Sequence, residues 1–343
     1  MKTCKTCQQN FETTDEDRRF YKIFQVPEPK NCPDCRFQRR LLERNTRKLY
    51  KRKCDFSGEE IIAQYHKDHP FPVYHQETWW SDKWDPLKYG QDYNPKESFF
   101  EQFKRLKNKT PHTALFVIGG TMENSDYTNC AGYLKNCYLS FEVDYNEDCY
   151  YSNRVYHSKD LVDCWTCYKS EVCYECSHCQ NCYNLKYSQD CEHCTDSWFL
   201  KECKSCEHCT ACVNLRHKKY CIFNEQYSKE EYEEKMKEHD LKTPQNIEKL
   251  GEKAREFFKN HPNRALQEEH NENSLGDYLY HSKDALNCFD CQDLEDCRYC
   301  AKVSLKVKTS MDYTCWGAQA ELMYQCAACG DNAYNLKFCT TCT

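Results

Sequence analysis

The regular alternation of polar and apolar positions in the middle of the chain predicts its architecture. From about Asn136 to Asn224 the sequence divides into consecutive triplets whose middle residue is small or apolar and whose flanking residues are mostly polar or aromatic. Because side chains alternate across an extended chain, a triplet facing out, in and out is a minimal strand. Two outward residues meet at each junction and make a corner. This pattern excludes a helix bundle and predicts a mainly β fold, a β-solenoid.

The spacing of cysteines predicts the length of one coil of this solenoid. One series recurs at every fifteenth position, and comprises Cys149, Cys164, Cys179, Cys194 and Cys209. A second series has the same step, and comprises Cys176, Cys191, Cys206 and Cys221. We therefore expect a Cys-cored β-solenoid with about 15 residues per coil, which corresponds to five triplets.

A polar, charged segment interrupts the triplets. Ser228 and Glu231 are typical of a capping box that opens a helix, and a second helix is expected to start at Thr243 and Pro244. The triplets return near Tyr280 and continue toward the carboxyl end, where they stop inside a coil. Another helix is expected before the solenoid, with Asn94 as its cap.

Two CxxC pairs near the start predict a metal site. Each short loop, Cys4 to Cys7 and Cys32 to Cys35, can present two thiolates to one ion. Two such loops make the tetrahedral four-thiolate site that structural Zn²⁺ prefers. Between them, Thr14 and Asp17 are typical of a capping box opening a short helix. Four unliganded surface thiols are the alternative.

This amino-terminal segment resembles a known family. Over about the first 45 residues, both CxxC loops, the intervening Phe20–Tyr21 pair and the CxxCR exit are similar to the bacterial "probable zinc-binding domain" family of zinc ribbons. The resemblance implies zinc bound by Cys4, Cys7, Cys32 and Cys35, and implies no enzyme activity. The whole chain resembles uncharacterised Cys-rich bacterial proteins, a family that implies no activity.

A strongly basic segment follows the second CxxC pair. Its cations are Arg36, Arg39, Arg40, Arg44, Arg47, Lys48, Lys51, Arg52 and Lys53. On a helix starting near Pro33, five of them would share one face by i+3 and i+4 spacing. Such a helix beside a zinc module is a plausible binder of nucleic acid or of a nucleoprotein. The alternative is a solvated basic face that pairs with the chain's own acidic parts.

The solenoid cysteines allow three interpretations. With five triplets per coil, CxxC pairs would stack coil on coil and could hold further soft metal, which names Cys176, Cys179, Cys191, Cys194, Cys206 and Cys209 as ligands. Reduced thiols packed as small hydrophobic side chains explain the same columns, since Ser and Leu also occur in them. Disulfides are the third interpretation.

Composition supports a framework of this kind. Leu, Ile, Val and Phe make up only about 16% of the chain, whereas 30 Cys and 26 Tyr supply much of what can be buried. The start has no apolar h-region and no apolar run reaches the roughly 18 residues of a membrane span, so we expect a reducing cytoplasm. An outward aromatic ladder of Tyr168, Tyr183 and Trp198 would bind glycans or bases, or dock a domain.

These patterns predict five regions: a zinc ribbon with a basic helix (1–53), an aromatic-rich connector with a capping helix (54–112), a first solenoid part (113–226), a helical insert (227–270) and a second solenoid part (271–343). The expected function is a non-enzymatic zinc-binding scaffold, with a protein partner at the open solenoid edge as a further expectation. Storage or sensing of soft metal by the solenoid thiols is one alternative. A thiol oxidoreductase or glycan-active enzyme is another, for which no exposed reactive CxxC or acid cluster stands out.

Overall fold

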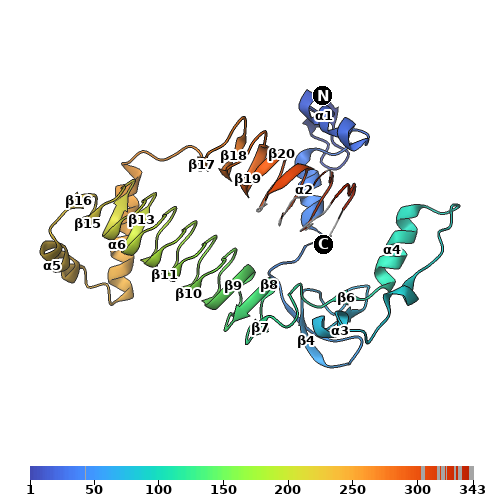
Figure 1. Ribbon diagram of the computed structural model, residues 1–343, viewed down its shortest axis with the longest axis horizontal. Coiled ribbons are helices and arrows are strands. Elements are labelled where there is room, and N and C mark those ends of the chain that lie inside the picture. The colour runs from blue at the N-terminus through green and yellow to red at the C-terminus, as the bar shows by residue number, and fades with distance from the viewer. Residues whose placement is uncertain are drawn as a thin grey trace. The chain divides into compact units, whose positions relative to one another are not determined.

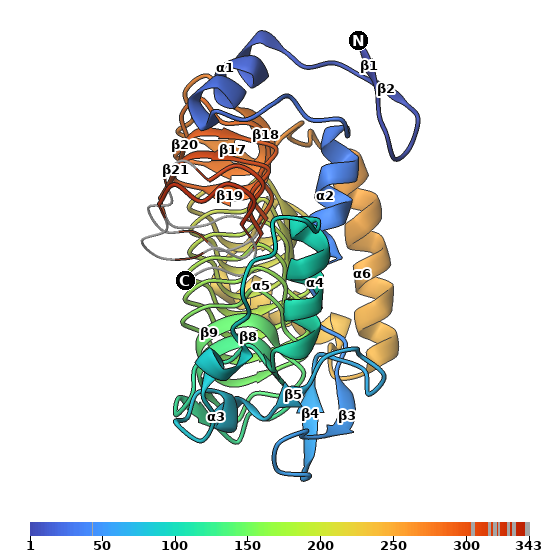
Figure 2. The same cartoon turned by 90° about the vertical axis from the view of Figure 1, so that its right-hand side faces the viewer.

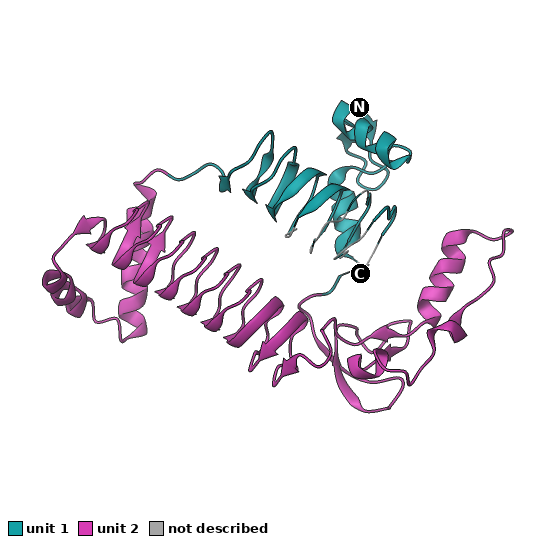
Figure 3. Cartoon of the chain, in the orientation of Figure 1, with its two compact units in different colours: residues 1–45, 263–343 teal, residues 46–262 magenta. Residues whose placement is uncertain are grey.

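A computed structural model describes residues 1–343 except 43, 303–305, 315–316, 318–320, 322, 328–329, 331–333 and 340–343. The described residues are mainly β, with six α-helices and two large sheets built almost entirely of parallel strands. The chain divides into two compact units, one of residues 1–45 and 263–343 and the other of residues 46–262 (Figure 3).

The larger unit contains a ten-stranded sheet, called repeat sheet 1 below (Figure 1). Its strands are β7 (Met122–Glu123), β8 (Asn129–Lys135), β9 (Phe141–Tyr150), β10 (Lys159–Val162), β11 (Glu171–Tyr174), β12 (Tyr183–Lys186), β13 (Thr195–Lys201), β14 (Glu207–Val213), β15 (Lys219–Ile222) and β16 (Glu225–Gln226). Their order in space follows their order in the chain. All neighbours are parallel except β15 and β16, which are antiparallel.

The register of repeat sheet 1 corrects the predicted coil length. Cys149 pairs with Leu161, and Leu161 pairs with Cys173, so each strand position recurs after twelve residues. Isolated bridges outside the named strands keep the same step, as between Trp165 and Ser177. Paired residues are therefore separated by four triplets, and the prediction of five triplets per coil is wrong. Residues that are twelve positions apart thus lie on one another and are said below to share a column. Cys164 and Cys179, which were expected to share a column, belong to two different ones.

The inward position of every third side chain is confirmed by burial, and the corner between triplets has a defined conformation. The residue before each inward residue adopts positive φ, for example +52° at Asn136 and +52° at Asp148. Asn and Asp tolerate this left-handed conformation better than most residues. They also join neighbouring repeats: Asn124 Nδ2 donates to Asn136 Oδ1 at 3.0 Å, and Asn136 Nδ2 donates to Asp148 Oδ1 at 3.1 Å.

The inward residues have a particular hydrogen-bonding requirement. In many triplets their backbone N–H donates to a side chain located one repeat earlier: the N–H of Cys164 donates to Ser152 Oγ at 3.2 Å. A cysteine sulfur can take the place of the hydroxyl, since the N–H of Asn224 donates to Cys212 Sγ at 3.4 Å. Buried amides need such partners. Cysteine and serine therefore share these columns because both are small and both accept the inward N–H.

The thiols of the core also act as donors. Cys164 Sγ donates to the carbonyl of Cys173 at 3.5 Å, and Cys179 Sγ donates to the carbonyl of Ser188 at 3.7 Å. No disulfide joins any of the cysteines in the described part of the chain. The arrangement thus agrees with the interpretation of these cysteines as reduced packing residues.

The helical insert has the two predicted helices, α5 (Lys229–His239) and α6 (Pro244–Lys259). The Ser228–Glu231 capping box and the Thr243 cap are both confirmed. Helix α6 packs beside β13 and β14, where Leu250 and Ala254 join a cluster with Phe199. Figure 1 labels β13 next to α6, and Figure 2 shows α6 along its length. No helix among the described residues is long and apolar enough to cross a membrane.

The connector of the larger unit has two small sheets and a buried cluster of its own, apart from those of repeat sheet 1. It comprises β3 (Tyr50–Lys53), β4 (Glu60–Ala63), β5 (Val73–Tyr74), α3 (Gln76–Trp79), the 3₁₀ helix η1 (Pro86–Tyr89), α4 (Phe99–Lys109) and β6 (His112–Thr113). Helix α4 begins after Ser98, so the predicted cap at Asn94 is wrong. Asn94 instead closes a turn in which its carbonyl accepts the N–H of Glu97 at 3.2 Å.

The smaller unit contains a five-stranded parallel sheet, called repeat sheet 2. Its strands are β17 (Glu268–Glu269), β18 (Leu275–Tyr280), β19 (Leu286–Gln292), β20 (Leu294–Arg298) and β21 (Val307–Met311). The same unit contains β1 (Lys2–Thr3), β2 (Asn10–Phe11), α1 (Asp15–Phe24) and α2 (Pro33–Leu41). The Thr14–Asp17 capping box at the start of α1 is confirmed.

Candidate metal centre

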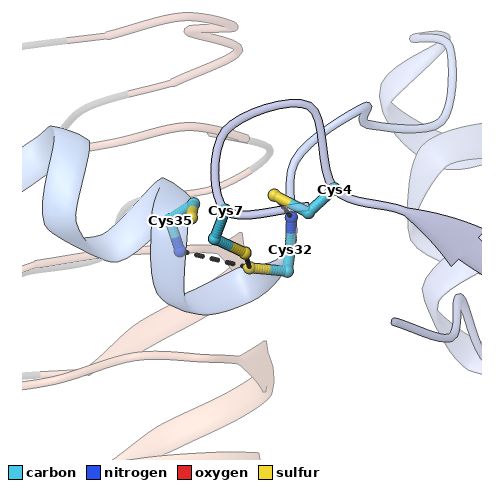
Figure 4. A group of neighbouring side chains, drawn as sticks. All are labelled: Cys4, Cys7, Cys32 and Cys35. Atoms are coloured by element: carbon cyan, nitrogen blue, oxygen red, sulfur yellow. Dashed lines mark hydrogen bonds between the residues drawn. The ribbon is translucent and has the colours of Figure 1, made fainter. Parts of the chain in front are cut away.

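Four cysteines come together where two loops of the smaller unit meet (Figure 4). Cys4 and Cys7 lie in the turn between β1 and β2, while Cys32 caps α2 and Cys35 lies in its first turn. The four Sγ atoms all lie within 4.8 Å of one another. The predicted ligand set is therefore assembled, and it could hold a metal ion.

The donor set suits a tetrahedral ion. Four thiolates about 2.3 Å from a central Zn²⁺ would place neighbouring sulfur atoms about 3.8 Å apart. Cys7 Sγ and Cys32 Sγ lie 3.8 Å apart. Backbone amides support the thiolates, because the N–H of Cys32 donates to Cys4 Sγ at 3.3 Å and the N–H of Cys35 points at Cys32 Sγ at 3.5 Å.

The electrostatics of the four thiols also favour a cation. Burial opposes ionisation of Cys4, yet backbone N–H groups, first that of Cys32, outweigh it and lower the pKa of Cys4 to about 6. Burial, followed by the neighbouring thiols, raises the pKa of Cys35 to about 12. A cluster that favours ionisation of Cys4 and opposes that of Cys32 and Cys35 is completed by a positive ion, which would stabilise the thiolates.

The helices around this centre pack against repeat sheet 2. Phe20, Tyr21 and Phe24 of α1 form an apolar cluster with Met311 and Tyr324. Asp17 accepts a hydrogen bond from Arg298 Nη1 at 2.6 Å and another from the Tyr299 hydroxyl at 3.2 Å. The segment that contains the cysteines and the end of repeat sheet 2 therefore share one interior.

The basic segment does not form one long helix. Helix α2 ends at Leu41, before Asn45 and Thr46, residue types that favour turns over helix interiors. The expected helical face is therefore wrong beyond Arg40. Lys51, Arg52 and Lys53 belong instead to strand β3.

The two arginines of α2 on the expected face point inward. Arg36 and Arg40 are 2% and 4% exposed. Arg36 pairs with Asp312, and Arg40 Nε donates to Thr314 Oγ1 at 2.8 Å. Arg36 thus pairs with one of the chain's own acidic groups, as the alternative interpretation expects, but the two side chains are buried and do not form a solvated face.

The other predicted basic residues are placed as follows. Arg39 is exposed and contacts Gln325, and Arg44 is half-buried near the carbonyl of Thr314. Arg52 is buried and pairs with Asp55 at 2.7 Å. The exposed cations of this segment in the larger unit are Arg47, Lys48, Lys51 and Lys53. Two of them lie on aromatic rings, Arg47 over Trp165 and Lys48 over Tyr50.

The six core cysteines predicted as further ligands do not stack as expected. With the twelve-residue register, Cys179 and Cys191 share a column, as do Cys194 and Cys206, while Cys176 and Cys209 lie in two others. Throughout the described residues, the only group of three or more His, Cys, Asp or Glu side chains near enough to hold an ion is the one at Cys4, Cys7, Cys32 and Cys35.

The predicted aromatic ladder is also wrong, for the same reason. Tyr168 pairs with Gln180, Tyr183 pairs with Thr195, and Trp198 pairs with Thr210, so the three rings lie in separate columns. A different stack is present at a corner column. The ring centroids of Tyr133 and Tyr145 are 4.4 Å apart, and the two rings are 4° from parallel. The ring centroids of Tyr145 and His157 are 4.8 Å apart. Their twelve-residue spacing is the signal that could have identified them.

Comparisons with known proteins do not place the chain in a family. No family model matches it, and no curated protein matches its sequence. Solved structures that match include a protein provisionally assigned as an acetyltransferase from Desulfovibrio desulfuricans G20. That chain is 9% identical over 61% of each chain, with a TM-score of 0.14. A similarity this low indicates neither a shared fold nor a shared activity.

Proposed function

We propose that the protein is a non-enzymatic scaffold in which Cys4, Cys7, Cys32 and Cys35 bind one structural Zn²⁺. The observation that carries this proposal is the convergence of four Sγ atoms within 4.8 Å from two separate loops. An all-thiolate tetrahedral set favours zinc among the common divalent ions. It leaves no open coordination position, whereas catalytic zinc keeps one for water or substrate.

The role of the metal is to hold the amino-terminal segment in a shape that fits repeat sheet 2. Arg36 directly follows the ligand Cys35, and its Nη1 donates to the carbonyl of Asn31, next to the ligand Cys32, at 2.8 Å. The same guanidinium pairs with Asp312. Metal binding and docking are thereby linked through one side chain.

The two repeat sheets are, in this proposal, walls of β-solenoids, with twelve residues per coil in repeat sheet 1 and eleven to thirteen in repeat sheet 2. Four inward columns of Cys, Ser, Leu and Val and four corners with positive φ support that description. A solenoid offers a long, regular surface for partners. Its reduced thiols agree with a protein that functions in a reducing cytoplasm.

Metal content under reducing conditions tests the function. Native mass spectrometry of the purified chain should report one zinc ion per chain, and Cys7→Ser should abolish it. Cys179→Ser, a change of the same kind at a buried core position, should leave the zinc content unchanged. Zinc retained by Cys7→Ser, or no zinc in the unaltered chain, would contradict the proposal. Many ions per chain would favour metal storage instead.

A further inference from the structure

The connector repeats the pattern of backbone hydrogen bonds that surrounds the metal centre. Each of the two patterns, with the two loops that it joins, is called a frame below. In the first frame, the N–H of Cys4 donates to the carbonyl of Gln9 at 2.9 Å, and the N–H of Gln8 donates back to the carbonyl of Cys4 at 3.0 Å. In the second frame, fifty residues later, the N–H of Cys54 donates to the carbonyl of Glu59, and the N–H of Gly58 donates back to the carbonyl of Cys54, both at 2.9 Å. The fifth residue of each loop has positive φ, +60° at Gln8 and +77° at Gly58.

The hairpins that carry these loops have the same register. In the first, Thr3 pairs with Asn10 across β1 and β2, directly beside the loop. In the second, Lys53 pairs with Glu60 across β3 and β4 at the same distance from the loop. The equivalence therefore extends from the loop into both flanking strands.

The second half of each frame also corresponds. The N–H of Lys5 donates to the carbonyl of Lys30, and the N–H of Asp55 donates to the carbonyl of Val73, both at 2.9 Å. Two residues after each acceptor, an N–H donates to the sulfur of the first loop: Cys32 to Cys4 Sγ and His75 to Cys54 Sγ, both at 3.3 Å. Each donor residue is the cap of the helix that follows, α2 or α3.

These matched contacts define four equivalent positions. The ligand positions Cys4, Cys7, Cys32 and Cys35 correspond to Cys54, Ser57, His75 and Thr78. Ser and Thr hydroxyls are not among the ligands that structural zinc uses. Two of the four ligands are therefore missing from the second frame, while the backbone that would present them is retained.

An apolar core holds the second frame together where the first frame would have a metal. Cys54 is 1% exposed within a cluster that contains Ile61, Phe71, Val73 and Tyr74. In the first frame, the buried cluster formed by α1 does not include the metal-centre cysteines. Burial of several such side chains stabilises a fold through the hydrophobic effect, which is the contribution that an ion makes in a small metal module.

We propose that residues 50–79 are a second copy of the metal-binding module, in which ligand positions 57 and 78 have been lost and an apolar core substitutes for the ion. The second module then folds without zinc but keeps the backbone geometry of a zinc site. This inference concerns different residues from the proposed function and does not depend on the first centre being loaded.

Restoring the missing ligands tests this inference. Ser57→Cys combined with Thr78→Cys provides three thiolates and one imidazole, so native mass spectrometry with added Zn²⁺ should report one zinc more than in the unaltered chain. Titration with Co²⁺ should add the absorption of a thiolate-ligated tetrahedral ion. The matched control, Ser57→Ala with Thr78→Ala, should gain nothing. Cys54→Ser in the unaltered chain should lose no zinc.

Two results would overturn the inference. One is a folded double cysteine variant, with an unchanged circular dichroism spectrum, that binds no additional Zn²⁺ or Co²⁺. The other is a loss of zinc from the Cys54→Ser variant. If the double variant does not fold, the single variant Ser57→Cys tests the inference instead. Its new thiol brings the number of ligands to three, together with Cys54 and His75, so it should still bind Co²⁺. Because each result is a difference from the unaltered chain, it is separable from the zinc content of the first centre.

Discussion

The guanidinium of Arg36 and the carboxylate of Asp312, 276 positions apart in the sequence, form a buried two-pronged ion pair. Arg36 Nε donates to Oδ2 at 2.5 Å and Nη2 donates to Oδ1 at 3.3 Å. Asp312 is fully buried, and the Arg36 side chain is 3% exposed. The pair joins the helix that carries two of the proposed metal ligands to repeat sheet 2.

Removing the carboxylate should strongly destabilise the smaller unit. Asp312→Ala leaves a buried guanidinium without its counter-charge, a change that typically costs about 3 to 5 kcal/mol. Chemical denaturation followed by circular dichroism measures the loss. The matched control is Asp296→Ala, which breaks the pair between Asp296 and the half-exposed Arg19 and should cost under about 1 kcal/mol. Equal losses for the two variants would show that the buried pair has no special role.

Metal removal should loosen the amino-terminal segment selectively. Folding of small metal modules is driven by metal binding, so a strong chelator with a thiol reductant should abolish the order of the two cysteine loops. Hydrogen exchange should then become faster in α1, α2 and β21, and stay slow in β9 to β14. Unchanged exchange in α1 and α2 would contradict a role of the metal in docking.

Core cysteines should tolerate serine better than alanine. At Cys164, serine keeps an acceptor for the inward N–H of Cys176 and a donor for the Cys173 carbonyl. Alanine removes both, and leaving a buried amide without a partner costs about 1 to 3 kcal/mol. Urea denaturation of Cys164→Ser and Cys164→Ala should therefore rank serine as the milder change. An alanine variant as stable as the serine variant would refute the acceptor role of the thiol.

Asp144 should make the stability of the larger unit depend on pH. Burial raises the pKa of its carboxyl to about 7, against which a hydrogen bond from the Gly132 N–H acts in the opposite direction. The folded chain thus holds a proton that the unfolded chain releases near pH 4. This stabilisation is fully present below about pH 4 and is lost as the pH rises to 7.

The Asp144→Asn variant isolates this effect. Asparagine keeps an acceptor for the Gly132 N–H but does not titrate. Urea midpoints measured between pH 5 and pH 8 should fall for the unaltered chain relative to the variant, so that the variant is the more stable of the two at pH 8. Parallel pH profiles would exclude a perturbed Asp144 carboxyl.

Nucleic acid binding, proposed from the basic segment, now depends on its exposed cations. Lys51 and Lys53 alternate with the buried Arg52 along β3 and so face the same side. In a filter-binding titration, Lys51→Glu with Lys53→Glu should weaken binding and reduce the salt slope by about 1 for each phosphate contact removed. The control is Lys259→Glu, a change at an exposed side chain at the end of α6. Binding that is insensitive to salt would argue against phosphate contacts.

Local signals can be predicted from this sequence, whereas long-range relationships cannot. The Thr14, Ser228 and Thr243 caps and the Cys4 to Cys35 ligand set depend on short spacings, and all are present. The coil length is not determined by the triplets, because any multiple of three keeps the same residues inward. Polar repeats at twelve, such as Ser140 with Ser152, could have identified it, since their side chains contact the next repeat.

The inward turn of Arg36 and Arg40 could not be predicted from the basic segment alone. Spacing on a helix shows which residues share a face, but not whether that face meets solvent or another part of the chain. Asp312 lies in a segment with no recognisable pattern, so its pairing with Arg36 depends on tertiary structure. The sequence does indicate Cys54 and His75 as remnants of a second zinc site, with Ser57 where a partner thiol would fall. The detailed match of this segment to the Cys4 loop lies in backbone hydrogen bonds, which no residue pattern shows.

The twelve-residue register also limits how such a chain can change in length. Deletion of residues 165–176 would bring Cys164 next to Ser188, which lies in the same column, so that every inward residue would still contact a residue of its own column. Deletion of five triplets would instead move every downstream side chain into an adjacent column. Each inward hydroxyl or thiol would then lose the backbone N–H that it accepts. Tandem gain or loss of segments is therefore expected to occur in multiples of twelve residues, which would let the length of the proposed scaffold change without a redesign of its interior.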